Sequence, residues 1–190
     1  MMTFSFRHAA WIALAAMVIP LGFAQAADKE ALFTVSSSAV KDNGVLTAKN
    51  AGPGECGGEN VSLPLKWANQ PPSTKSYAII LSDPDGGRGA GVTHWLAYNI
   101  PGSMLEVKSG QGAATGKDIT VGKNSRGAEA YLGPCAPHAD APHHYIAQVL
   151  ALDIAPGTIQ PGLDREGLFK MINGHSLKVT SLVLRFRRKE

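Results

Sequence analysis

The sequence predicts a mainly β protein with one or two short helices. Short runs of β-branched and aromatic residues recur between segments rich in glycine, proline and asparagine, which is the pattern of strands joined by turns. Several runs are apolar at successive positions, as in central strands covered on both faces. The chain from residue 27 to residue 190 fits a single domain with an ordinary core.

The first 26 residues are predicted to be a cleaved signal peptide. Arg7 precedes an apolar run from Ala9 to Leu21, and small residues at Ala24 and Ala26 form a cleavage site. The alternative is a membrane anchor, but the run is shorter than the roughly 20 residues that cross a bilayer. We therefore expect a periplasmic or secreted protein.

Five strands and one helix are expected along the chain after the predicted signal peptide. The expected strands are 32–40, 77–82, 92–100, 144–152 and 176–186, chosen by length and composition. Residues 163–174 are expected to form a helix, with Asp164 as the N-cap and Gly174 at its end. Internal repeats and low-complexity tracts are absent from the sequence.

The charge balance argues against a strongly charged partner. The formal net charge is +3, and it falls to +2 without the leader, because Arg7 is the only charged residue that leaves. The basic residues between Arg185 and Lys189 are interpreted as a solvated strand end, since a nucleic-acid surface needs a wider patch. No nucleic-acid partner is expected.

Two cysteines, Cys56 and Cys135, each lie in a loop rich in glycine and proline. Exported proteins meet oxidising conditions, and two cysteines allow one intramolecular pairing, so we expect a disulfide. Two free buried thiols, or a metal site with two cysteine ligands, are the alternatives.

An acidic motif, "DPD", follows the expected strand 77–82. Asp83 and Asp85 lie at the end of this strand, with Pro84 between them withholding an N–H from any ladder. His94 belongs to the next strand, so the intervening connection can return its imidazole to the carboxylates. We take these three side chains as one candidate site.

A second motif, "YLGPCAPHADAPHHY" at 131–145, supplies three more histidines. Alternation along a strand places His143 and Tyr145 on one face and His144 on the other, so His143 is the better site residue. His138 is interpreted as a solvated loop residue.

Several motifs together, in this order, make the chain from about Val61 to Arg187 similar to the phosphatidylethanolamine-binding and Raf-kinase-inhibitor-like proteins, in their exported bacterial branch. The motifs are "NVSLPLKW" (60–67), "SDPDGG" (82–87), "THWLAYNIPGS" (93–103), "YLGPCAPH" (131–138), "HHYIAQVLALD" (143–153) and "INGHSL" (172–177). The resemblance implies a β-sandwich-like fold with a small anion pocket at one end. It implies a pocket lined by Asp83, His94, Gly133, Pro137, His143 and Tyr145, with Asp85 nearby.

The function expected from this resemblance is non-enzymatic binding or regulation through a phosphoryl or lipid-headgroup ligand, without a cofactor or metal. Protonated imidazoles, a tyrosine hydroxyl and loop N–H groups can donate to phosphate oxygens. Two other classes stay open: an inhibitor of a protease, kinase or host partner, and a metal-dependent hydrolase using Asp83, His94 and His143. A homodimer and a protein partner are also left open.

Overall fold

The computed structural model describes residue 2 and residues 31–189 of the chain. The signal peptide predicted for residues 1–26 lies outside the described segment 31–189 and stays a prediction. Among the described residues, none of the helices has the length and apolar character that a bilayer crossing requires.

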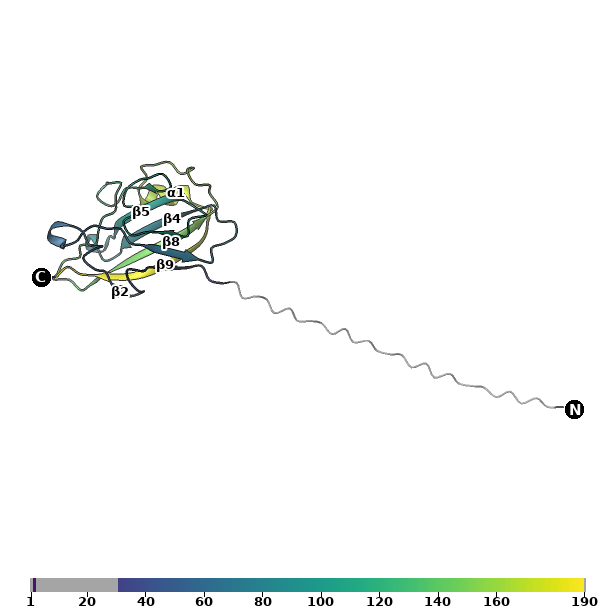
Figure 1. Cartoon of the computed structure of the whole chain (residues 1–190), viewed down its shortest axis with the longest axis horizontal. Coiled ribbons are helices and arrows are strands. Elements are labelled where there is room, and N and C mark those ends of the chain that lie inside the picture. The colour runs from purple at the N-terminus through teal and green to yellow at the C-terminus, as the bar shows by residue number, and fades with distance from the viewer. Residues whose placement is uncertain (1, 3–30, 190) are drawn as a thin grey trace. The chain divides into compact units, whose positions relative to one another are not determined.

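Residues 31–189 form two β-sheets and one α-helix (Figure 1). The large sheet has the order β2-β9-β8-β4-β5-β7, and the small sheet has the order β1-β3-β6. The elements are β1 (Thr34–Ser36), β2 (Gly44–Val45), η1 (Gly54–Cys56), β3 (Leu65–Ala68), β4 (Ser76–Asp83), η2 (Gly87–Gly89), β5 (Val92–Pro101), β6 (Glu106–Val107), β7 (Thr120–Val121), β8 (His143–Leu152), α1 (Arg165–Met171) and β9 (Ser176–Phe186). The fold class predicted from the sequence is confirmed.

Both faces of the large sheet are buried, as the continuous apolar strands predicted. On β4, Tyr77, Ile79 and Leu81 pack in the main core with the small sheet's Leu65 and Trp67. The intervening β4 residues, Ala78 and Ile80, pack in a second core on the opposite face. This alternation follows from the two-residue period of a strand.

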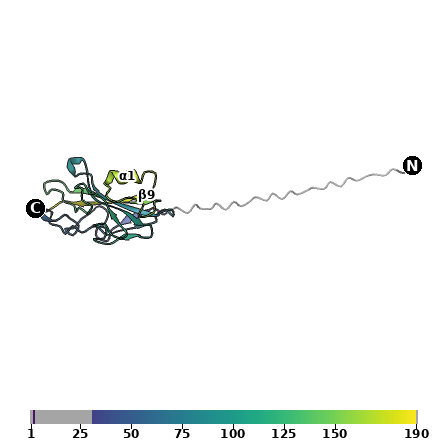
Figure 2. The ribbon, with the colours of Figure 1, turned by 90° about the horizontal axis from the view of Figure 1, so that it is seen from above.

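The second core is covered by α1, which lies to one side of the strands (Figure 2). Leu168 and Ile172 are the residues that α1 and its end contribute to this core. The Asp164 side chain accepts a hydrogen bond from Gly167 N at 2.8 Å, so the predicted N-cap is confirmed. The helix ends at Met171, earlier than predicted, and Gly174 follows with a φ of 78°.

The first predicted strand was too long. β1 stops at Ser36, because the Ser37 hydroxyl accepts a hydrogen bond from Ala39 N and closes a local turn. The strand β3 was not predicted, because its four residues are too few to give a clear periodic pattern.

Cys56 and Cys135 form a disulfide, with their Cα atoms 5.2 Å apart. The predicted pairing is therefore present, and the described residues hold no free cysteine. The bridge joins the η1 loop to the loop at 131–137, which borders the candidate site described next.

Candidate functional site

Three central strands of the large sheet bring the candidate residues to one end of it. β4 runs antiparallel to both β5 and β8, so the end of β4 lies beside the starts of the other two. Asp83 ends β4, His143 begins β8, and His94 lies near the start of β5. The meeting of carboxylate and imidazoles that the sequence predicted is thus a consequence of sheet topology.

A β-bulge turns His94 toward this end of the sheet. Leu81 pairs with Trp95 while the next β4 residue pairs with Thr93, so His94 is the extra residue of β5. Bulges re-aim a side chain that strict alternation would send to the other face. The His94 side chain is buried, with 5% of the residue's surface exposed.

The end of the sheet and the loop at 131–137 enclose a pocket of about 450 Å³, hereafter the Asp83 pocket. All seven ligand-binding residues expected from the resemblance line it, namely Asp83, Asp85, His94, Gly133, Pro137, His143 and Tyr145. His138 does not line it and is exposed, as expected. The pocket is also lined by further polar side chains that were not predicted from the sequence, namely Arg88, Ser125, Arg126 and Asp140.

The Asp83 carboxylate links the loop after β4 to the two histidines. Its Oδ1 accepts hydrogen bonds from the backbone N–H groups of Asp85 and Gly86, both at 2.9 Å. Its Oδ2 lies 2.8 Å from His143 Nδ1 and 3.9 Å from His94 Nε2. Asp83 is 3% exposed, and these contacts satisfy both oxygens of a buried carboxylate.

His143 has a raised pKa. Burial alone would lower the pKa, but the hydrogen bond and charge of Asp83, assisted by Asp140 and Asp85, outweigh burial. The Asp140 carboxylate lies 3.6 Å from His143 Nε2. His143 is therefore the histidine that carries positive charge most readily in this pocket.

His94 has a lowered pKa, chiefly because burial disfavours its charged form. Its Nδ1 lies 2.8 Å from the carbonyl oxygen of Leu132, which can only accept, so Nδ1 carries the hydrogen. In the neutral ring, Nε2 then offers a lone pair. His94 thus adds a hydrogen-bond acceptor where His143 adds a donor.

Tyr145 packs edge-on against His94, with ring centroids 5.2 Å apart. Burial, with the nearby Asp83 charge, raises the pKa of Tyr145 far above its usual value, so its hydroxyl is neutral. The Asp83 carboxylate and the backbone N–H groups of Cys135 and Ala136 are polar neighbours of this hydroxyl. None of the described residues, however, completes a well-formed hydrogen bond with the buried oxygen.

His144 points to the opposite side of β8, as alternation predicted. Its backbone N and its Nδ1 bind the Asp85 carboxylate at 2.7 and 2.8 Å. These hydrogen bonds lower the pKa of Asp85. Asp85 lines the pocket, but its carboxylate is hydrogen-bonded to His144 and not to His94 or His143.

The loop at 131–137 is held against the sheet by several contacts. Leu132 N donates to His94 O at 2.8 Å, and Gly133 N donates to the Asn60 side chain at 2.7 Å. The disulfide anchors the same loop at Cys135. This wall of the pocket is therefore tied both to β5 and to the segment at 51–60.

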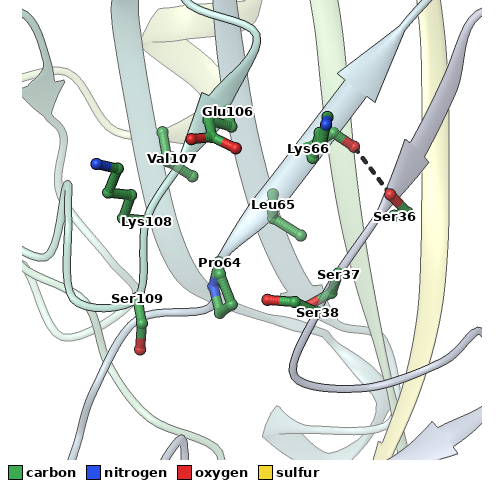
Figure 3. Close-up of a pocket in the computed structure, with 10 residues that line it drawn as sticks. All are labelled: Ser36, Ser37, Ser38, Pro64, Leu65, Lys66, Glu106, Val107, Lys108 and Ser109. Carbon is green, nitrogen blue, oxygen red and sulfur yellow. Dashed lines mark hydrogen bonds between the residues drawn. The ribbon is translucent and has the colours of Figure 1, made fainter.

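A second hollow of about 400 Å³ lies on the small sheet, beside β1, β3 and β6 (Figure 3). Its charged side chains, Lys66, Glu106 and Lys108, are all exposed, and the Ser36 hydroxyl donates to the Lys66 carbonyl oxygen. This hollow lacks the buried ionisable side chains that distinguish the Asp83 pocket, so the candidate site is the Asp83 pocket.

Together these features define a class of protein: a two-sheet β fold with a histidine–aspartate pocket at one end of its larger sheet. The sequence profile of the phosphatidylethanolamine-binding protein family matches residues 36–187, and the chain belongs to this family.

Individual relatives agree with this assignment. The UPF0098 protein PH1269 of Pyrococcus horikoshii is 36% identical over 158 residues, covering 80% of this chain and 76% of that protein. The UPF0098 protein YbcL of Escherichia coli is 34% identical over 137 residues, covering 70% of this chain and 75% of that protein. The crystal structure of E. coli YbcL, described as a new member of the mammalian PEBP family, superposes with a TM-score of 0.76 at 28% identity. That superposition covers 84% of this chain and 100% of that one.

Proposed function

We propose that this chain is a non-enzymatic binding or regulatory protein whose Asp83 pocket takes an oxyanion, in the first place a phosphoryl group of a small molecule or lipid headgroup. The observation that carries the proposal is the Tyr145 hydroxyl, a buried neutral donor that lacks a well-formed hydrogen bond among the described residues. Tyr145 lines the pocket, so a small shift of its ring or of the pocket wall would let a ligand oxygen accept from this donor, and burying such a donor unsatisfied costs free energy.

The charges of the pocket support an anion in particular. The negative charge of Asp83 is offset by His143 when that ring is protonated, and both Asp83 oxygens already have partners. Protonated His143, whose Nδ1 is held by Asp83, then donates a hydrogen bond to the ligand from Nε2, which lies 3.6 Å from the exposed Asp140 carboxylate. Neutral Tyr145 donates another from its hydroxyl. The neutral His94 Nε2 accepts one from a ligand O–H, as in a singly protonated phosphate.

We also propose export to the periplasm or the medium. The N-terminal pattern of an apolar run followed by small residues supports it, as does the Cys56–Cys135 disulfide.

The test of the anion proposal is a sulfate titration followed by chemical shifts of pocket residues, since sulfate keeps its charge across the range in which histidine titrates. We expect tighter binding at about pH 6 than at about pH 8, because His143 loses its charge as the pH rises through its raised pKa. Tyr145→Phe should weaken binding about tenfold at both pH values, the effect of one hydrogen bond to a charged ligand.

The variant His143→Ala should remove most of the pH dependence, whereas the matched control His138→Ala, on the exposed loop residue outside the pocket, should bind like the wild type. Equal sulfate affinity in wild type, His143→Ala and Tyr145→Phe at both pH values would show that these residues do not form an anion site.

A further inference from the structure

Two arginines reach the mouth of the Asp83 pocket from separate loops. Arg88 belongs to η2, in the glycine-rich loop after β4, and Arg126 belongs to the turn before the loop at 131–137. Both side chains line the pocket and both are exposed. Within the described part of the chain, neither guanidinium group makes an ion pair or a side-chain hydrogen bond.

The backbone holds Arg88 at the pocket. The hydrogen bond from Gly86 N to Asp83 Oδ1 ties the start of the loop to β4. Arg88 itself has φ 60° and ψ 37°, a left-handed conformation that is uncommon for a residue other than glycine. Such outliers cluster at functional sites, where surrounding contacts maintain them.

Arg126 is held in a similar way. The Asn124 side chain accepts a hydrogen bond from Arg126 N at 2.9 Å, and Asn124 is itself buried. Ser125 exchanges two hydrogen bonds with Thr93, the residue before His94. The charge of Arg126 is close enough to contribute to the lowered pKa of His94. Both arginines therefore project from fixed backbone positions.

The acidic residues of the pocket are already paired. Asp83 contacts His143, Asp85 contacts His144, and Asp140 lies 3.6 Å from His143 Nε2. The charged groups left without such a contact at the pocket mouth are thus the two guanidinium groups. An arginine presents planar donors suited to a carboxylate or a phosphate.

From this arrangement, and resting on the proposed function, we infer the ligand class. The pocket takes a small phosphorylated molecule that carries a second anionic group, a carboxylate or another phosphate. The phosphoryl group binds at Tyr145 and His143, and Arg88 and Arg126 bind the second anion at the mouth. A ligand with an ammonium group in that position would meet two cations.

The test uses three probes that share a phosphoryl group: glycerol phosphate, 3-phosphoglycerate and phosphoethanolamine. Calorimetric titration should show 3-phosphoglycerate binding about tenfold more tightly than glycerol phosphate, the gain of one charge-assisted contact. Phosphoethanolamine should bind most weakly. Raising the salt concentration should reduce the preference for 3-phosphoglycerate, because the arginines are exposed and screened.

The double variant Arg88→Gln/Arg126→Gln should bring the affinity ratio of 3-phosphoglycerate to glycerol phosphate close to one. The matched control Arg187→Gln, an exposed arginine outside the pocket, should leave the ratio unchanged. An affinity ratio near one in the wild type, or an unchanged ratio in the double variant, would overturn the inference. If sulfate still binds in that case, the proposed function stands. If neither the probes nor sulfate bind, both are wrong.

Discussion

Two residues of the same type acquire opposite properties in this pocket. His94 and His143 both face Asp83, yet the pKa of His94 is lowered and that of His143 is raised. His94 gives its Nδ1 hydrogen to a neutral carbonyl and is more deeply buried, whereas His143 binds the carboxylate directly at 2.8 Å. The sequence could not decide between these outcomes, because burial and a nearby negative charge shift a histidine pKa in opposite directions.

The variant Asp83→Asn tests this assignment. The asparagine side-chain oxygen can still accept the backbone N–H groups of Asp85 and Gly86, but the negative charge is gone. We expect the pKa of His143 to fall, because burial then acts with less opposition. An NMR titration of the imidazole carbon protons measures the change, with the exposed His138 as internal control. An unchanged His143 pKa in a folded Asp83→Asn protein would mean that another group raises it.

At the level of elements, the sequence predicted the long strands well. β4, β5, β8 and β9 lie within a residue of the predicted limits, and β9 matches them. Their runs of apolar residues are long enough to dominate the local pattern. The bulge at His94 could not be predicted, because the register between two strands depends on the partner as well as on the strand itself.

The contacts that the loops make around the pocket could not be predicted from the sequence either. Gly133 was expected in the pocket from the resemblance alone, and the structure supplies a steric reason for a glycine there. A Cβ atom at this position would overlap the backbone nitrogen of Gly52. The pocket wall and the segment at 51–60 thus need a glycine where they meet. The sequence did not indicate Arg88 and Arg126 as pocket residues, because isolated arginines in loops form no recognisable pattern.

Gly133→Ala is therefore predicted to destabilise the protein by about 1–3 kcal/mol, the usual cost of overpacking. The added methyl group must push the loop at 131–137 away from Gly52, which should also weaken sulfate binding. Chemical denaturation and the sulfate titration measure the two effects. The control is Gly116→Ala, where a Cβ meets nothing within 4 Å. Equal stability of the two variants would contradict a tight contact at Gly133.

At the scale of the whole molecule, the disulfide connects the pocket to distant parts of the chain. Cys56 and Cys135 are separated by 79 positions, and a cross-link over such a distance restricts the unfolded chain strongly. Near the bridge, Arg188, beyond the end of β9, binds Glu55 at 2.8 Å, and Arg188 N donates to Ala136 O. The pocket wall thus joins segments from the beginning, middle and end of the domain.

Export and the disulfide can be examined on the same material. Intact-mass analysis of protein from the periplasmic fraction, alkylated without reductant, should give a chain that begins at Ala27 and carries no alkyl group.

The double variant Cys56→Ser/Cys135→Ser should lose about 2–4 kcal/mol of unfolding free energy in urea denaturation, because the unfolded chain regains its conformational freedom. Dithiothreitol should lower the stability of the wild type but leave that of the variant unchanged. Two alkylated thiols, with the wild type insensitive to dithiothreitol, would refute the bridge, and an intact Met1 would refute cleavage of the leader.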